Sequence, residues 1–294
     1  MNNNKYIEFK KQRELGDLLG DSFAFLRAQF KPFFTSFFKI VGPYLLVFLI
    51  SFVFYTNSYK SFFNFTIETS NDNYNPIMMI GSLALFFIAS VVAYAASQAM
   101  TLYYIKIYIE EKRTPTFQEV KKEVYGSFWN FFGLTFLVVM CVGIGLVICF
   151  LPGIYLAVPL SMSFGIMVFE RKSIGEAFSN SFTLVRDNWW ISFAYLLVIV
   201  IIISVAGYAF SMPATIYAIM KMGIFSGEID PANMIDSIYD PIGIILNVLG
   251  MLFQFGLNII LVIFTILMYF NLNEKKNHTG TLERIGNLGK NSEQ

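Results

Sequence analysis

KSIGEAFSNSFTLVRDNWWISF, residues 172–193, is the stretch that decides the fold, because a second copy of it lies near the N-terminus. Residues 15–34, LGDLLGDSFAFLRAQFKPFF, align without a gap with residues 174–193. Each copy has helical spacing of its apolar residues and runs directly into a long apolar segment. We therefore interpret it as a repeated unit of construction. The positions identical in both copies are Gly16/Gly175, Ser22/Ser181, Phe23/Phe182, Arg27/Arg186 and Phe34/Phe193.

The composition is that of a membrane protein. Apolar residues make up 56% of the 294 positions and charged residues only 14%. The 33 Phe residues and the positive mean hydropathy are more than a soluble domain of this length tolerates. The formal net charge is +1, which gives no electrostatic reason to expect nucleic acid or an acidic substrate. We therefore expect an integral membrane protein that binds no nucleic acid.

Hydropathy divides the chain into six long apolar stretches, which predict transmembrane helices. Residues 15–30 have an amphipathic pattern instead, which is typical of a helix lying in the membrane interface. The predicted fold class is therefore an all-α integral membrane protein with six transmembrane helices. The expected spans are residues 33–55, 77–105, 131–150, 154–169, 189–210 and 242–270.

Two capping boxes indicate a third, diverged copy of the unit. Residues 116–119 (TFQE) and 173–176 (SIGE) both match the S/T-x-x-E pattern that begins helices. The first box is expected to open a short helix through Tyr125. Residues 151–153 (LPG) are expected to form a tight turn between the third and fourth spans.

We therefore expect one six-helix membrane domain over residues 1–270 and a polar cytoplasmic tail at residues 271–294. Each unit is a cytoplasmic interfacial amphipathic helix followed by a hairpin of two spans. Because every unit enters the membrane from the same side, these are expected to be parallel pseudo-repeats. The units are predicted at about residues 13–110, 114–170 and 172–270.

The distribution of basic residues predicts the orientation. Of the 21 Lys and Arg residues, only Lys60 and Lys221 belong to the side opposite the termini, when Lys39 and Lys106 are counted as snorkelling to the terminal side. The positive-inside rule then places both termini in the cytoplasm. It places the acidic loop at residues 211–240 on the extracytoplasmic side.

Residues 151–190, LPGIYLAVPLSMSFGIMVFERKSIGEAFSNSFTLVRDNWW, carry a family resemblance. They resemble the six-helix membrane-domain families of uncharacterised bacterial proteins that include the membrane domain fused to some glycerophosphodiester phosphodiesterases. The resemblance implies the six-span fold and a multi-pass protein of the bacterial cytoplasmic (inner) membrane, and it implies no activity. The catalytic barrel of those phosphodiesterases has no counterpart in this sequence. The matching residues are Pro152, Gly153, Glu170, Ala177, Ser181, Leu184, Asn188 and Trp190.

Amides inside the predicted spans are the strongest candidate site residues. Asn247, Gln254 and Asn258 share one face of the sixth span, and Gln98 lies in the second. Because an unpartnered amide in hydrocarbon costs several kcal/mol, this stripe could line a solute path or a lipid headgroup pocket. The alternative is hydrogen bonding between packed helices, worth about 0.6 kcal/mol per contact.

Charges at the predicted cytoplasmic interface form the second candidate set. Arg27 and Arg186 occupy equivalent positions in the repeat and could bind lipid phosphates or simply snorkel. Glu170 ends the fourth span and could pair with either arginine or remain solvated. Cys141 and Cys149 lie in one apolar segment, where thiols usually behave as small hydrophobic groups.

No catalytic constellation is present in the sequence. It has no nucleotide-binding loop, no H-E-x-x-H motif and no nucleophile set, and the lone His278 excludes a multi-histidine metal site. We expect no enzyme activity, no cofactor and no metal. The leading hypothesis is a membrane scaffold or accessory subunit that organises lipids or partner membrane proteins, a second copy of the chain included. The alternative is a permease or exporter of a lipid or small solute, with its path along the sixth-span amides.

Overall fold

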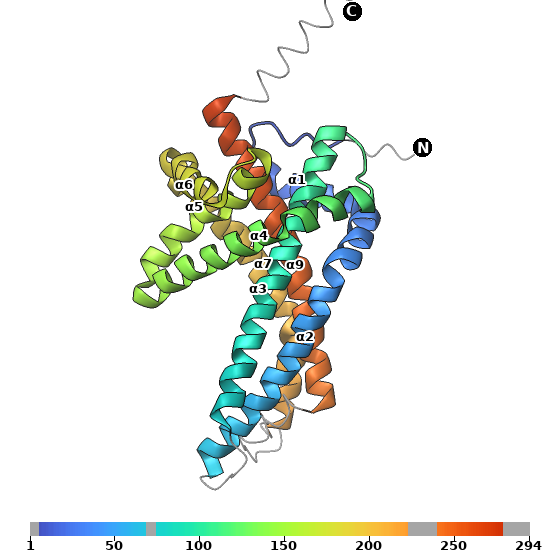
Figure 1. The fold of residues 1–294 in the computed structure, drawn as a ribbon, viewed down its shortest axis with the longest axis vertical. Helices are drawn as coiled ribbons and strands as arrows, with labels where there is room; N and C mark the ends of the chain where they lie inside the picture. The colour runs from blue at the N-terminus through green and yellow to red at the C-terminus, as the bar shows by residue number, and fades with distance from the viewer. Residues whose placement is uncertain (1–5, 69–74, 223–239, 279–294) are drawn as a thin grey trace, which may run out of the picture. The chain divides into compact units, whose positions relative to one another are not determined.

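The computed structural model describes residues 6–68, 75–222 and 240–278, and every regular element within these ranges is helical (Figure 1). The elements are α1 (Leu15–Ala28), α2 (Phe30–Glu68), α3 (Pro76–Glu111), α4 (Phe117–Ile148), α5 (Phe150–Phe169), α6 (Ile174–Val185), the 3-10 helix η1 (Arg186–Asn188), α7 (Trp189–Lys221) and α9 (Pro241–Asn277).

Six helical stretches are long and apolar enough to cross a membrane, as hydropathy predicted. Most extend beyond the predicted spans, because the helical hydrogen-bond ladder continues through polar residues after the apolar stretch ends. α7 continues to Lys221, so the residues after Phe210 that were expected to begin a loop are helical as far as Lys221. The acidic positions Glu228, Asp230 and Asp236 lie outside the described residues. The protein is therefore all-helical in its described part and multi-pass.

α4 differs from the predicted short helix followed by a separate span. It runs without a break from Phe117 to Ile148. No proline occurs between these residues, and the lone glycine of the polar part, Gly126, costs only about 1 kcal/mol relative to alanine. The capping box at residues 116–119 is present, so the predicted start of the helix is confirmed. The predicted boundary after Tyr125 is wrong.

The turn between α4 and α5 also lies earlier than predicted. Cys149 alone joins the two helices, with extended backbone at φ −163° and ψ 138°, and residues 151–153 belong to the first turns of α5. Pro152 fits there because the first N–H groups of a helix have no helical acceptor. Gly145 and Gly153 instead permit close packing, since a Cβ added at Gly145 would lie 3.0 Å from the Gly153 Cα atom.

The chain divides into two compact units. Unit 1 contains Met1–Ile40, Ala95–Ile201 and Ile259–Gln294, and unit 2 contains Val41–Tyr94 and Ile202–Asn258. The helices α2, α3, α7 and α9 each contribute residues to both units. The boundaries of the units do not coincide with those of the predicted repeats, which stay a prediction from the sequence.

Unit 1 has an aromatic core to which α1 contributes one face. Phe25 of α1 contacts the rings of Phe9 and Tyr104 at centroid distances of 5.4 and 6.4 Å. Phe33, at the start of α2, packs against Tyr104 at 5.1 Å. All four rings are almost fully buried, and aromatic side chains of this kind bury about 150–250 Å² each. The amphipathic pattern of α1 thus serves to anchor it to unit 1.

Unit 2 is packed through phenylalanine rings as well. Phe86 of α3 stacks on Phe48 of α2 at 5.5 Å, and Phe48 also contacts Phe255 of α9 at 6.4 Å. Phe210 of α7 and Phe253 of α9 are stacked at 4.1 Å. Offset stacking adds about 0.5–1.5 kcal/mol per pair to the effect of burial. The Phe210–Phe253 pair joins α7 and α9, which line a hollow described below.

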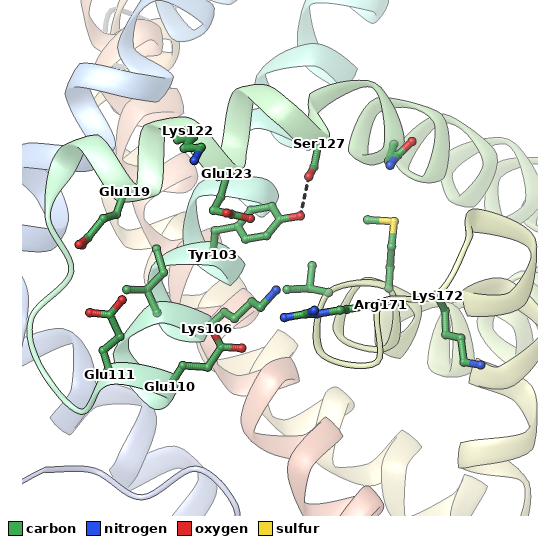
Figure 2. A pocket seen from close by; sticks show the side chains of 14 residues that line it. Tyr103, Lys106, Glu110, Glu111, Glu119, Lys122, Glu123, Ser127, Arg171 and Lys172 are labelled. Carbon is green, nitrogen blue, oxygen red and sulfur yellow. Dashed lines mark hydrogen bonds between the residues drawn. The ribbon is translucent and has the colours of Figure 1, made fainter.

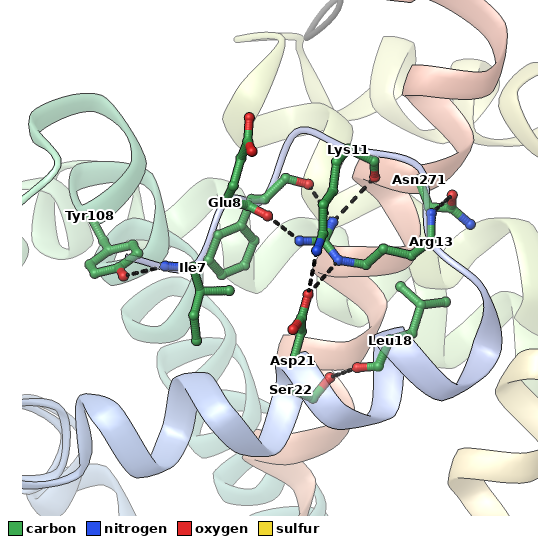
Figure 3. A network of polar contacts seen from close by, with 10 residues as sticks. Ile7, Glu8, Lys11, Arg13, Leu18, Asp21, Ser22, Tyr108 and Asn271 are labelled. Atoms are coloured by element: carbon green, nitrogen blue, oxygen red, sulfur yellow. Dashed lines mark hydrogen bonds and ion pairs between the residues drawn. The ribbon is translucent and has the colours of Figure 1, made fainter. Parts of the chain in front are cut away.

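The irregular segment before α1 is tied firmly to unit 1 (Figure 3). The backbone N–H of Arg13 donates to the Asn271 side-chain oxygen at 2.9 Å, although Asn271 was predicted to begin a polar tail. The Arg13 guanidinium is buried, and donates to the Asp21 carboxylate at 2.8 Å and to the Phe9 carbonyl at 2.7 Å. Residues 271–277 therefore belong to α9, and Asn271, Leu272 and Glu274 are buried in unit 1.

Candidate functional site

The α3–α4 and α5–α6 connections are built in the same way. The first reads Glu-Lys-Arg at residues 111–113, and the second reads Glu-Arg-Lys at residues 170–172. In each connection the middle residue has left-handed backbone, with φ 52° at Lys112 and 55° at Arg171. A residue other than glycine costs on the order of 1 kcal/mol or more in this region. The conformation ends one helix and turns the chain toward the next.

A capping box follows each of these turns. The Glu119 carboxylate accepts the backbone N–H of Thr116 at 2.9 Å, and the Glu176 carboxylate accepts that of Ser173 at 2.9 Å. These contacts fix where α4 and α6 begin. The turns are therefore held between two defined helix ends and present their charged side chains from fixed positions.

These elements surround a charged cavity of about 640 Å³ within unit 1 (Figure 2). Its walls come from the end of α3, the start of α4 and the end of α5 with the turn that follows. Apolar contacts from Ile107, Met167 and Val168 complete the lining. The basic residues that line the charged cavity are Lys106, Lys122, Arg171 and Lys172.

The acidic residues of the charged cavity are not equivalent. Glu111 and Glu119 both pair with Arg113, with an Arg113–Glu119 distance of 2.5 Å. Glu110 and Glu123 also line the cavity, but neither forms an ion pair with any residue of the described ranges. Two of the four acidic lining residues are therefore neutralised by Arg113, which does not itself line the cavity.

Three of the four basic residues that line the charged cavity, Lys106, Lys122 and Arg171, have no carboxylate partner within the described ranges. Lys106 from α3 and Arg171 from the turn after α5 point toward one another in Figure 2, and neither has an ion pair or side-chain hydrogen bond within the described part of the chain. The Lys106 ammonium lies 5.6 Å from the centroid of the Tyr103 ring. The Tyr103 hydroxyl donates to the Ser127 oxygen at 2.6 Å, which leaves the Ser127 hydroxyl proton available to a ligand.

The charged cavity is not predicted from the sequence, where Lys106 is expected only to snorkel. Its residues come from three separate segments, and charges at helix ends resemble ordinary interfacial residues. The signal that could have found it is the repeated pair of turns, each with a glutamate, two basic residues and a capping box.

A second hollow in unit 1, of about 790 Å³, is lined by aromatic residues and is called the aromatic hollow here. Trp189 stacks between Tyr155 at 5.4 Å and Phe193 at 5.3 Å, and its indole N–H donates to the Tyr155 carbonyl at 3.4 Å. Trp190 also lines the hollow and is 76% exposed. Arg186 supplies the basic group of this lining.

The predicted interface charges are not brought together. Glu170 accepts the Tyr269 hydroxyl at 3.0 Å, and it pairs with neither Arg27 nor Arg186 in the described structure. The reason is that the Tyr269 ring packs on Gly165, where a Cβ would lie 2.9 Å from the ring. This packing places the Tyr269 hydroxyl within hydrogen-bond distance of Glu170. Arg27 is exposed on α1, and Arg186 lines the aromatic hollow.

Two of the four predicted amides line a hollow of about 400 Å³ in unit 2, called the amide hollow here. Asn247 and Gln254 of α9 face small residues of α7, among them Gly207, where an added Cβ would collide with the Gln254 amide oxygen. The Asn247 amide donates to the Gly243 carbonyl at 2.8 Å. The spacing of these two amides thus predicted a shared helix face.

Asn258 and Gln98 do not line the amide hollow. The Asn258 side-chain oxygen is buried and accepts no hydrogen bond from the described residues. Gln98 is buried within unit 1, with 6% of its surface exposed. The four predicted amides therefore do not form one site, because only Asn247 and Gln254 line the amide hollow.

Asp240 caps the start of α9 and lies at the centre of a cluster of polar contacts in unit 2. Its carboxylate accepts the Gly243 N–H at 2.6 Å and the Tyr217 hydroxyl, and it lies 3.4 Å from the Lys221 ammonium. The Tyr217 hydroxyl, the Gly243 N–H and the Lys221 charge together lower the pKa of Asp240. The carboxylate form is favoured because each of these groups interacts with the negative charge.

Comparisons with protein-family models, with curated proteins and with solved structures found no match. The resemblance of residues 151–190 to a bacterial membrane-domain family therefore stays a prediction. Across residues 6–68, 75–222 and 240–278, no group of three or more His, Cys, Asp or Glu side chains could hold a metal ion. The fold defines a class, the all-helical multi-pass membrane proteins, and three hollows are its candidate sites.

Proposed function

We propose that this protein is a non-enzymatic scaffold or accessory subunit of the bacterial cytoplasmic (inner) membrane, which organises lipids and partner membrane proteins. The observation that carries the proposal is the aromatic hollow, which combines an exposed indole ring with a guanidinium group. Trp rings favour the membrane–water interface, and a basic residue there attracts anionic lipid by about 1 kcal/mol. A phospholipid would place its phosphate against Arg186 and its chains along Leu151 and Ile191.

The proposed arrangement in the membrane follows the sequence repeat. In it, α1 and α6 lie in the cytoplasmic interface, each before a hairpin of two spans, and the start of α4 takes the corresponding place in the middle unit. The matching turns at residues 111–113 and 170–172, each with its capping box, support a common unit used in parallel. Both termini are then cytoplasmic.

Cysteine labelling in cells tests this orientation. Cys141 and Cys149 are free and are first replaced by serine. Asp236→Cys is then expected to react with a membrane-impermeant thiol reagent added outside the cell. Labelling that requires access from the cytoplasm would overturn the proposed topology.

Native mass spectrometry of the full chain, purified in a mild non-ionic detergent, tests lipid binding at the aromatic hollow. The wild type is expected to retain anionic phospholipid. Arg186→Gln is expected to lower retention about fivefold, which corresponds to about 1 kcal/mol. Arg27→Gln is the matched control, because Arg27 occupies the equivalent repeat position outside the hollow. Equal effects of both variants, or a wild type that is monomeric without lipid or partner, would contradict the proposal.

The alternative function is a permease or exporter of a lipid or small solute. The amide hollow favours it, because Gln254 is exposed beside Gly207 and an amide facing hydrocarbon without water is unfavourable. In this case Asn247 and Gln254 would border a hydrated path through unit 2.

Solvent access at the amide hollow separates the two functions. In the cysteine-free background, Gln254→Cys is expected to react with a water-soluble thiol reagent only if the path is hydrated. Leu249→Cys, an exposed position of α9 outside the hollow, is the control for lipid-facing surface. Reaction at Gln254→Cys alone would favour the permease, and reaction at neither position would favour the scaffold.

A further inference from the structure

We propose that the charged cavity binds a single phosphate group between Lys106 of α3 and Arg171 of the turn after α5. The ligand chemistry is a phosphate ester, carried either by a lipid headgroup or by a soluble compound. This site is separate from the aromatic hollow, with which it shares no lining residue. The proposal therefore does not depend on lipid binding at Arg186.

The first support is the direction of the two cations. Lys106 and Arg171 come from different elements and point toward one another, although like charges repel (Figure 2). An anion between them converts this repulsion into two charge-assisted hydrogen bonds. The Ser127 hydroxyl and the Asn130 amide also line the cavity and add neutral donors. Planar guanidinium and compact ammonium groups together are a common means of holding phosphate.

The second support is that three neighbouring acidic residues are engaged elsewhere. Glu170 precedes Arg171 in the chain, but it accepts the Tyr269 hydroxyl at 3.0 Å and does not line the cavity. Glu111 and Glu119 are held by Arg113. These contacts engage three carboxylates that could otherwise pair with the two cations.

The third support is the backbone of Arg171. Its φ of 55° lies in the left-handed region that glycine adopts most readily. An arginine at this position retains an unfavourable backbone and places a guanidinium at the wall of the cavity. Lys112 has the same backbone in the α3–α4 turn, with φ 52°, but does not line the cavity. Lys112 is therefore a control for Arg171, because it has the same backbone conformation outside the cavity.

The remaining acidic lining limits the ligand to one phosphate group. Glu110 and Glu123 have no ion-pair partner in the described ranges, so their negative charge stays within the cavity. A polyphosphate would approach these carboxylates and be repelled. A single phosphate group can be held between Lys106 and Arg171, whose side chains point toward one another (Figure 2).

Calorimetric titration of the delipidated full chain in detergent with inorganic phosphate tests the site. The wild type is expected to bind phosphate saturably. Arg171→Gly is expected to weaken binding at least about tenfold, as the loss of a charge-assisted hydrogen bond predicts, without lowering the melting temperature. Lys112→Gly is expected to relieve the same backbone conformation and leave phosphate affinity unchanged.

Lys106→Gln provides a second variant, expected to weaken phosphate binding by a similar factor from the other wall of the cavity. An absence of saturable binding to the wild type would overturn the proposal. Equal phosphate affinities of Arg171→Gly and Lys112→Gly would overturn it as well.

Competition in lipid nanodiscs identifies the source of the phosphate. If a lipid headgroup occupies the site, phosphatidylglycerol in the nanodisc weakens glycerol 3-phosphate binding to the wild type. Phosphatidylcholine with the same chains is the comparison. If phosphatidylglycerol does not compete, the site takes a soluble phosphate ester. A wild type that binds glycerol 3-phosphate in neither nanodisc nor detergent would contradict the site itself.

Discussion

Replacement of Arg13 by methionine should release the segment that precedes α1. The Arg13 guanidinium is fully buried and donates to Asp21 and to the carbonyl oxygens of Glu8, Phe9 and Lys11 (Figure 3). Removal of this side chain leaves several carbonyl groups without their donor, and leaves the Asp21 carboxylate with Lys11 alone. Methionine has a similar volume, so the change removes hydrogen bonds and charge more than it removes packing.

The expected magnitude follows from the loss of hydrogen bonds to a charged group, because the Asp21 side chain is 26% exposed and also contacts Lys11. Such a loss costs about 1.5–3 kcal/mol. If this cost falls on local opening of the segment, the open population rises by a factor of about 10–100, since 1.4 kcal/mol is tenfold. Phe9 is 1% exposed, so chymotrypsin should cleave after Phe9 only in the open state. The initial rate of this cleavage in detergent is the measurement.

Lys11→Met is the matched control, because Lys11 contacts the same Asp21 carboxylate at 3.4 Å with a side chain that is 41% exposed. An exposed pair contributes at most about 1 kcal/mol, so cleavage should accelerate no more than about fivefold. Arg13→Lys keeps the positive charge but not the planar guanidinium, so its cleavage rate should lie between those of Arg13→Met and Lys11→Met. If Arg13→Met is cleaved no faster than Lys11→Met, the buried network does not hold the segment.

Two further changes test the packing of α4 with α5 and the cap of α9. Gly153→Ala places a Cβ 2.7 Å from the Leu146 backbone nitrogen, so we expect a loss of about 1–3 kcal/mol in thermal unfolding, whereas Gly143→Ala, with open space around it, should be neutral. The partners of Asp240 lower its pKa below the ordinary value of 3.8. The carboxylate therefore stabilises the folded state above pH 3.8, and this stabilisation is lost as the pH falls through the lowered pKa. Tyr217→Phe removes the main partner and should reduce this loss on acidification in melting curves, and an unchanged pH dependence would refute the role of the phenol.

The number and order of the spans follow from hydropathy, but their ends do not. Hydropathy reports only the apolar part of a helix, whereas the backbone ladder continues until a cap or a proline ends it. The capping boxes at residues 116–119 and 173–176 therefore predicted two helix starts correctly. The boundary expected after Tyr125 was wrong because no residue there breaks a helix. The turn expected at residues 151–153 was wrong because proline and glycine have another use at the start of α5.

The candidate sites were harder to predict than the spans. Asn247 and Gln254 stand two turns apart on one helix, so their shared face could be read from spacing. The charged cavity depends on contacts among three segments, which no local pattern reports. Whether Glu170 pairs with an arginine or with Tyr269 is decided by the packing of α9 on Gly165, a fact of tertiary structure.

The two similar turns each contain one lysine and one arginine, but the arginine has a different role in each. The order of the two residues along the chain explains the difference. At residues 111–113 the lysine takes the left-handed position and Arg113 reaches Glu111 and Glu119. At residues 170–172 both basic residues line the charged cavity, but the arginine takes the left-handed position and has no ion pair, while Lys172 lies 3.9 Å from Glu176.

Exchange of the order in the second turn, Arg171→Lys with Lys172→Arg, tests this explanation at constant charge. The guanidinium should then be held by Glu176, and the group at position 171 becomes a lysine that cannot hold phosphate in a bidentate way. We expect phosphate affinity to fall about tenfold in the calorimetric titration, with little change in melting temperature. Unchanged affinity would show that only the total positive charge of the turn matters, and that the order of its residues has no part in the site.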